Sequence, residues 1–210
     1  MTDNLQADGA ILLAGGKSQR MGEDKTRLLV DGQSILVRTI TKLQGFADRI
    51  IIVADDISRI SNPVGVTPEP EIVIDRFPDT GPLGGIITGM QALGDGSHLV
   101  VACDMPGLNI GVLELLLQRV SANFDAVVPT TGGNAEPLCA VYNSTCLPLL
   151  LDYLASGGRS VHKALSKLNT VYIDESTWGP VDPTGNCFTN LNKPEDLAQY
   201  LARISPSSSN

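Results

Sequence analysis

Five short apolar runs recur along the first part of the chain, and this recurrence limits the fold more than any other feature. They occupy residues 10–14, 49–54, 71–75, 98–103 and 125–129. A continuous apolar run is typical of a strand buried on both faces of a parallel sheet. Amphipathic segments with helical spacing lie between the runs, and strands alternating with helices indicate βαβ units. We therefore expect an α/β fold of three layers, with helices on both faces of a mostly parallel sheet.

The pattern changes after residue 129. A turn cluster, TGGN, covers 131–134, and a short apolar run follows at 138–142, which predicts a small antiparallel excursion. Further helices are expected at 145–156, 160–168 and 194–203, with a strand at 170–173. The polar composition of both ends predicts a flexible N-terminal arm at residues 1–8 and a disordered tail at residues 205–210. Between them we expect a single domain at residues 9–204.

The charge balance excludes several function classes. The chain has 15 basic and 23 acidic residues, a net charge of −8, and only 4% aromatic residues. It has neither the basic surplus nor the aromatic residues of a typical nucleic-acid binder, so we expect no nucleic-acid partner. No apolar run is long enough to cross a bilayer, and the N-terminus lacks the pattern of a secretory signal, so we expect no membrane contact.

Cysteine and histidine usage favours a structural role for both residue types. The four cysteines contain no C-x-x-C pair and fit buried apolar positions in a reducing cytoplasm. The only two histidines, His98 and His162, fall within a predicted strand and helix. A Ser-His-Asp hydrolase therefore has little support.

The loop after the first apolar run concentrates glycine and positive charge. It begins at Gly15 and carries 4 of the 15 basic residues of the chain, at positions 17, 20, 25 and 27. A Walker A loop would need its first glycine at Ile11, and a G-x-G-x-x-G fingerprint is absent. Backbone N–H groups and cations of such a loop are suited to phosphate binding, whereas a solvated charged turn is the alternative.

Two aspartates close neighbouring apolar runs. Ligands of an open parallel sheet bind beyond the carboxyl ends of its strands, so Asp75 and Asp104 should face the glycine loop. Asp104 could hold Mg²⁺ or simply end its strand before Pro106. Asp75 could bind a base or ribose, or simply end its strand.

Five sequence blocks, in order, resemble one enzyme family. They are LAGGKSQRMGEDK at 13–25, GPLGGI at 81–86, CDMP at 103–106, EPLCAVY at 136–142 and NLNKPED at 190–196. Together they resemble the molybdenum cofactor guanylyltransferase (MobA) family of the nucleotidyltransferases. The resemblance implies a Rossmann-like nucleotidyltransferase fold and transfer of GMP from GTP to the terminal phosphate of molybdopterin, with release of pyrophosphate.

The resemblance also implies roles for individual residues. Nucleotide-binding residues would be Leu13, Ala14, Gly15, Gly16, Lys25, Asp75, Gly81 and Asp104. Arg20, Lys25 and Asp104 would be catalytic, with Asp104 holding Mg²⁺. The side of the cofactor substrate would include Arg159, Asn190 and Asn192. Implied partners are GTP, molybdopterin and molybdoenzyme maturation proteins, in the cytoplasm.

The chain departs from this family at two positions. The family often has an asparagine where residues 52–55 read IVAD, so Val53 cannot supply that contact and Asp55 is the possible substitute. Lys193 stands where threonine is usual. Two alternatives stay open: a cytidylyltransferase that uses CTP, and a non-catalytic nucleotide-binding relative, against which the presence of Lys25 and Asp104 argues.

Overall fold

The structure is a computed structural model, and the part of the chain that it describes is residues 5–15, 28–30, 32–60, 63, 65–121, 123–191 and 193–204. The predicted termini at 1–4 and 205–210 lie outside these residues. The remainder of the predicted arm is tied to the sheet: Ala7 is buried and its N–H donates to Phe46 O (2.8 Å), while Asp8 N–H donates to Ser97 O (2.9 Å). Within the described residues, no helix is both long and apolar enough to cross a bilayer.

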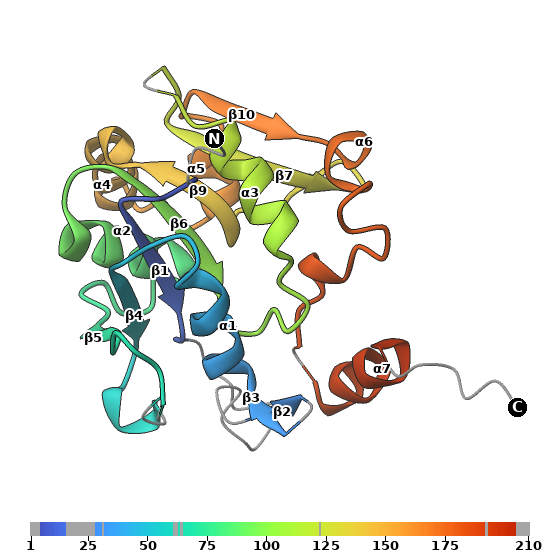
Figure 1. Ribbon diagram of the computed structural model, residues 1–210. Helices are drawn as coiled ribbons and strands as arrows, with labels where there is room; N and C mark the ends of the chain where they lie inside the picture. The colour runs from blue at the N-terminus through green and yellow to red at the C-terminus, as the bar shows by residue number, and fades with distance from the viewer. Residues whose placement is uncertain are drawn as a thin grey trace, which may run out of the picture.

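One twisted sheet runs through the molecule (Figure 1). Its strands, in spatial order, are β10 (Thr170–Ile173), β7 (Ala126–Thr131), β9 (Cys139–Asn143), β6 (Ser97–Ala102), β1 (Gly9–Leu13), β4 (Ile50–Ala54) and β5 (Glu71–Ile74). The pairs β10–β7, β6–β1, β1–β4 and β4–β5 are parallel. The mostly parallel sheet predicted from the apolar runs is confirmed.

Strand β9 is the antiparallel exception, and it lies between β6 and β7 and runs against both. A short strand, β8 (Asn134–Ala135), forms a hairpin with β7. Gly132 and Gly133 make that turn with positive φ angles of 57° and 79°, which glycine adopts without steric cost. The antiparallel excursion predicted after residue 129 therefore consists of β8 and β9.

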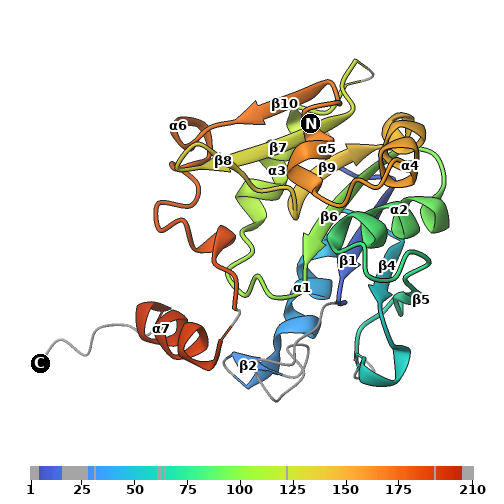
Figure 2. The same cartoon turned by 180° about the vertical axis from the view of Figure 1, so that it is seen from behind.

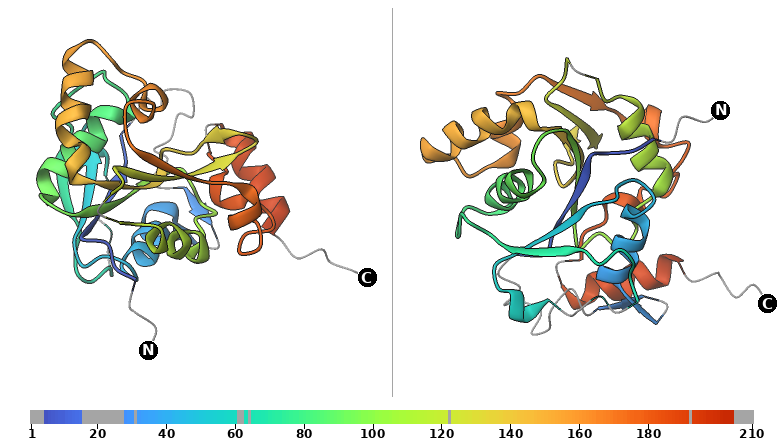
Figure 3. Two further views of the ribbon diagram at one scale, coloured as in Figure 1. Left: turned by 90° about the horizontal axis from the view of Figure 1, so that it is seen from above. Right: turned by 60° about the vertical axis from the view of Figure 1, so that its left-hand side comes forward.

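Helices cover both faces of the sheet, as predicted (Figure 2, and Figure 3, left). One face packs against α1 (Ile35–Leu43), α3 (Ile110–Gln118) and α6 (Glu175–Trp178), and the other against α2 (Pro82–Leu93), α4 (Leu147–Ala155) and α5 (Val161–Leu165). Side chains of β1 alternate between the two layers: Ala10 and Leu12 face the first, and Ile11 and Leu13 face the second. The core is thus two apolar layers separated by the sheet.

A smaller apolar cluster lies beside the end of the sheet. Strands β2 (Leu29–Val30) and β3 (Gln33–Ser34) form a hairpin, and α7 (Pro194–Ile204) packs near it. The cluster joins Leu28, Val30, Ile35, Leu191 and Tyr200. The 3₁₀ turns are η3 (Ile57–Arg59), η4 (Ser144–Cys146) and η5 (Asn186–Phe188).

Glycines let α2 lie very close to β1. A Cβ added at Gly85 would be 2.9 Å from Leu13 Cδ2, and one at Gly89 would be 2.5 Å from Ile11 Cγ2. The later glycine faces the earlier strand residue, so α2 runs opposite to β1. The N-terminus of α2 consequently lies at the carboxyl edge of the sheet.

Candidate active site

The carboxyl ends of four parallel strands meet at one edge of the sheet. Ala14 N–H donates to Val53 O (2.8 Å), and Asp75 N–H donates to Ala54 O (2.9 Å). On the other side of β1, Cys103 N–H donates to Leu13 O (3.0 Å). These bonds extend the sheet just beyond the strands, so the loops that follow β1, β4, β5 and β6 start side by side.

The first of these loops passes directly over a carboxylate. A Cβ added at Gly15 would lie 2.7 Å from Asp55 Oδ1 and 3.2 Å from Asp55 Cγ. A larger residue at position 15 would displace that side chain. The exposed carboxylate of Asp55 therefore lies against the backbone at the beginning of the glycine loop.

Asp75 lies next to this position and is partly held by the protein. Its Oδ1 accepts hydrogen bonds from Phe77 N–H (2.9 Å) and Thr88 Oγ1 (3.0 Å). Burial raises the pKa of Asp75, the two hydrogen bonds oppose this, and the nearby Asp55 carboxylate raises the pKa further. Among the described residues, none donates a hydrogen bond to Oδ2.

The start of α2 completes this side of the edge. Gly81 precedes the helix with a φ of 65°, and Pro82 occupies the first helical position. The N-terminus of a helix carries the positive end of its dipole, so it favours an anion. The predicted residue Gly81 thus lies at the same edge as Asp75.

Asp104 lies on the other side of β1, after β6. Its carbonyl accepts a hydrogen bond from Leu191 N–H (2.9 Å), and Leu191 is fully buried. This contact brings the exposed Asn190 next to Asp104, although 86 positions separate them in the sequence. The structure therefore joins Asp104 to the segment that contains Asn190.

Asp104 suits the Mg²⁺ that the resemblance implies. The described residues contain no cluster of three or more His, Cys, Asp or Glu side chains that could hold a metal ion by themselves. Magnesium at nucleotide sites usually takes one or two carboxylates, and substrate phosphates and water fill the remaining positions. A half-buried aspartate at the strand ends meets that requirement.

Arg159 is not joined to these residues by any described contact. Its guanidinium donates to Leu154 O (3.1 Å) and Gly158 O (2.7 Å), both in its own part of the chain. Four further predicted residues, Gly16, Arg20, Lys25 and Asn192, lie outside the described residues. Their roles remain predictions.

Two residues near the strand ends of the candidate site were not identified from the sequence. Thr88 was missed because its link to Asp75 depends on how α2 packs, which no local pattern indicates. The half-buried Glu136 lies in the EPLCAVY block, for which no role of this residue was predicted. The structure assigns both to the surroundings of the strand ends through hydrogen bonds and strand register.

Other polar groups behave as structural residues. His98 is fully buried, its Nε2 is 2.9 Å from Gly94 O, and burial lowers its pKa, so it stays neutral. His162 is exposed on α5, and the four cysteines are free and buried. The structural interpretation of His98 and of the cysteines is confirmed.

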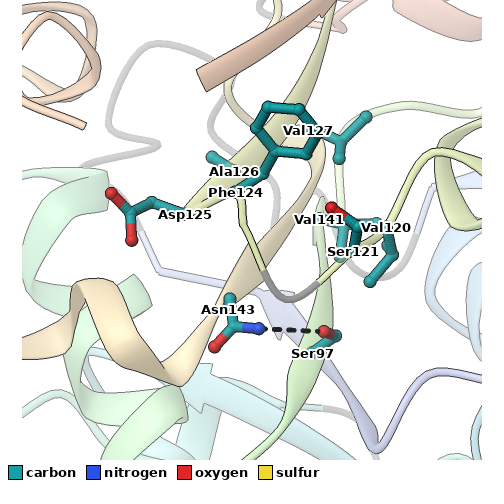
Figure 4. Close-up of a pocket in the computed structure, with 9 residues that line it drawn as sticks. All are labelled: Ser97, Val120, Ser121, Phe124, Asp125, Ala126, Val127, Val141 and Asn143. Atoms are coloured by element: carbon teal, nitrogen blue, oxygen red, sulfur yellow. Dashed lines mark hydrogen bonds between the residues drawn. The ribbon is translucent and has the colours of Figure 1, made fainter. Parts of the chain in front are cut away.

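A small hollow lies at the opposite edge of the sheet (Figure 4). It is lined by the beginnings of β6 and β7 and the end of β9. Its polar groups bind one another or neighbouring protein groups: Asn143 Nδ2 donates to Ser97 Oγ (3.4 Å), and Asp125 accepts from Thr145 Oγ1 (3.2 Å) and Asn169 N–H (2.9 Å). It is separate from the strand-end site.

Comparison with known proteins points to one family. The model of the MobA-like NTP transferase domain matches residues 10–170. A probable molybdenum cofactor guanylyltransferase of Chloroflexus aggregans is 34% identical over 200 residues, which are 92% of this chain and 93% of the relative. The molybdenum cofactor guanylyltransferase of Syntrophotalea carbinolica is 33% identical over 203 residues, 93% and 91% of the two chains.

A solved structure has the same fold. The molybdopterin-guanine dinucleotide biosynthesis protein A of Archaeoglobus fulgidus superposes with a TM-score of 0.79 and 27% identity. The match covers 94% of this chain and 98% of that one.

Proposed function

Because the chain belongs to the MobA-like NTP transferase family, we propose that it transfers GMP from GTP to the terminal phosphate of molybdopterin. The products are pyrophosphate and a guanine dinucleotide cofactor. The observation that most supports this is the meeting of Gly15, Asp75 and Asp104 at one edge of the sheet, in a chain whose relatives are named molybdenum cofactor guanylyltransferases.

The reaction needs alignment of two anions more than it needs a base. The second pKa of a phosphate monoester is about 6, so the attacking phosphate oxygen is already largely ionised at neutral pH. That oxygen forms a bond to the α-phosphorus of GTP, and the bond from the α-phosphorus to the bridging oxygen breaks. The electron pair leaves with pyrophosphate, and no proton has to be removed, in keeping with the structural role of His98.

The nucleotide occupies the side formed by β1, β4 and β5 in this proposal. Backbone groups of residues 13–16 approach the nucleotide, and the start of α2 faces its negative charge. Asp75 contacts the guanosine through Oδ2, since Oδ1 is held by Phe77 and Thr88. Arg20 and Lys25 neutralise the triphosphate and the departing pyrophosphate.

Asp55 takes the place of the asparagine that the family often has there. Its carboxylate lies against Gly15, at the start of the loop that would hold the nucleotide. A carboxylate accepts hydrogen bonds only, and guanine offers the donors N1–H and N2–H₂ on one edge. This chemistry favours GTP over CTP, whose base presents acceptors next to its single amino group.

Mg²⁺ would be held by Asp104 together with phosphate oxygens, and when bound it supplies positive charge to the triphosphate. Asn190 lies beside Asp104 and, with Asn192 and Arg159, belongs to the molybdopterin side in this proposal. Reduced, buried cysteines support a cytoplasmic location, where molybdoenzyme maturation proteins would receive the product.

Pyrophosphate release tests the proposal. Purified protein is incubated under anaerobic conditions with molybdopterin and either Mg-GTP or Mg-CTP. We expect pyrophosphate and the guanine dinucleotide to appear together with GTP, and CTP to react much more slowly. Faster reaction with CTP would identify a cytidylyltransferase, and no reaction with either would indicate a nucleotide-binding protein.

A further inference from the structure

Glu136 occupies a rigid turn between β8 and β9. Its N–H donates to Pro129 O (2.8 Å), and its carbonyl accepts from Cys139 N–H (3.2 Å). Both neighbours belong to strands of the main sheet, so the position of the Glu136 backbone is fixed on either side.

The described part of the chain contains no polar partner for the Glu136 carboxylate. The side chain is half-buried, yet no described residue donates a hydrogen bond to it or forms an ion pair with it. Burial raises the pKa of Glu136, and no described residue opposes the effect. An unpaired, partly buried carboxylate costs stability, and such costs are characteristic of groups retained for function.

Strand register brings Glu136 to the catalytic edge. Val101 of β6 faces Cys139 of β9, and Ala102 N–H donates to Leu138 O (2.9 Å). Because β9 is antiparallel, the residues just before it lie beside the residues just after β6. Asp104 lies two residues after Ala102, and Glu136 lies two residues before Leu138. Both residues therefore extend past the same end of the sheet.

The segment that contains Asn190 reaches the same corner. Cys139 Sγ is 3.9 Å from Cys187 Sγ, and both thiols are fully buried. Three residues after Cys187, the chain passes Asn190, and Leu191 N–H then donates to Asp104 O. Independent contacts thus gather Glu136, Asp104 and Asn190 around one end of β6.

The order of the strands separates this corner from the nucleotide side. Strands β1, β4 and β5, with Gly15, Asp55 and Asp75, lie on one side of β6. Strands β9 and β7, with the Glu136 turn, lie on the other. If GTP occupies the first side, the second substrate must approach from the second.

We propose that Glu136 binds the pterin ring of the acceptor substrate, an inference that rests on the proposed function. The reactive end of that substrate is a phosphate dianion, which a carboxylate repels. Its other end is a 2-amino-4-oxopyrimidine ring, whose amino group and neighbouring ring N–H are adjacent donors. A carboxylate accepts two such donors at once and fixes the orientation of a planar ring. Glu136 is therefore a binding residue that orients the acceptor, and it takes no part in bond formation.

Glu136→Gln tests the proposal, because it keeps the shape of the side chain and removes the charge. We expect the KM for molybdopterin to rise about tenfold or more, the size of losing one charge-assisted hydrogen bond. The KM for GTP and the Mg²⁺ concentration for half-maximal rate should change less than about twofold, well below that loss. Binding without turnover should weaken equally, measured by anaerobic co-elution of molybdopterin with the protein in the absence of GTP.

Stability provides a second readout. Since the carboxylate has no partner among the described residues, Glu136→Gln should leave Tm unchanged or raise it. Glu114→Gln, on the exposed side of α3, is the matched control and should affect neither substrate.

Each other outcome would overturn the assignment. A shifted Mg²⁺ requirement with normal molybdopterin binding would make Glu136 a metal ligand. Normal constants for both substrates, or a lower Tm with normal binding, would make it a structural residue. An inactive wild-type protein would instead refute the proposed function, so the two failures are distinguishable.

Discussion

α2 lies very close to β1 at Gly89, and a larger residue at this position tests whether the stability of the fold requires that close packing. A Cβ at position 89 would lie 2.5, 2.8 and 2.9 Å from Cγ2, Cγ1 and Cδ1 of Ile11. Ile11 is fully buried in the middle of β1, so its side chain has no free space to move into. In Gly89→Ala, either the side chain of Ile11 or the axis of α2 must shift.

Two opposing terms set the expected size of the effect. Alanine in place of glycine stabilises a helix interior by about 0.8–1.0 kcal/mol. Overpacking of a close-packed core costs about 1–3 kcal/mol, and three contacts below 3 Å indicate the upper part of that range. We expect Gly89→Ala to lower the free energy of unfolding by about 1–2 kcal/mol, a decrease in Tm of ~2–8 °C for a chain of this size.

Gly85→Ala is the matched control, since it lies one turn earlier on the same face of α2. Its added Cβ meets one terminal methyl, Leu13 Cδ2 at 2.9 Å, and the next contact, Val53 Cγ1, is at 3.8 Å. A terminal methyl moves easily, so this variant should be close to wild type in urea unfolding. If Gly89→Ala were as stable as Gly85→Ala, the tight packing of α2 on β1 would not be a constraint on the fold.

Further outcomes are expected at the site itself. Asp104→Ala should abolish Mg²⁺-dependent pyrophosphate release with an unchanged circular dichroism spectrum, and retained activity at limiting Mg²⁺ would remove it from the metal site. Lys25→Ala should lower kcat about 10²–10³-fold, the size of losing one preorganised charge-stabilising group, whereas Lys17→Ala should change it less than about threefold, as steady-state kinetics would show. Burial raises the pKa of Asp75 in the folded state above the unfolded value of 3.8. Between these two pKa values the folded state retains a proton that the unfolded chain releases, so stability is lost as the pH rises through this range. The change in Tm caused by Asp75→Asn should therefore be more favourable at ~pH 7 than at ~pH 3. An equal change in Tm at both pH values would contradict the raised pKa of Asp75.

The fold was predictable where it depends on local patterns. The apolar runs identified β1, β4, β5, β6 and β7, because a strand buried on both faces is a continuous apolar segment. Strands of two residues, such as β8, are too short to show any period. The place of β9 between β6 and β7 depends on pairing between distant segments, so the sequence indicates an antiparallel strand without its neighbours.

The site was predictable only in part, for a related reason. Asp75 and Asp104 could be identified because each directly follows a buried strand. Thr88 and Glu136 could not, since the first acts through a hydrogen bond across helix packing and the second reaches the edge through an antiparallel strand. Leu191, whose N–H anchors the Asn190 segment to Asp104, looks like any other core leucine in the sequence.

If the two substrates bind on the two sides of β6 as proposed, the reversed direction of β9 allows the two binding regions to change in sequence independently of each other. In the parallel half, the loops after β5 and β6 lead directly into α2 and α3, which pack against the sheet. The hairpin of β7 and β8, which turns at Gly132 and Gly133, leads the chain into β9 at the edge where β6 ends. Insertions or replacements in that hairpin would change the surroundings of Glu136, where we propose that the acceptor binds, and leave the proposed nucleotide loops in place. A lineage could thus exchange one acceptor for another while continuing to use the same nucleoside triphosphate.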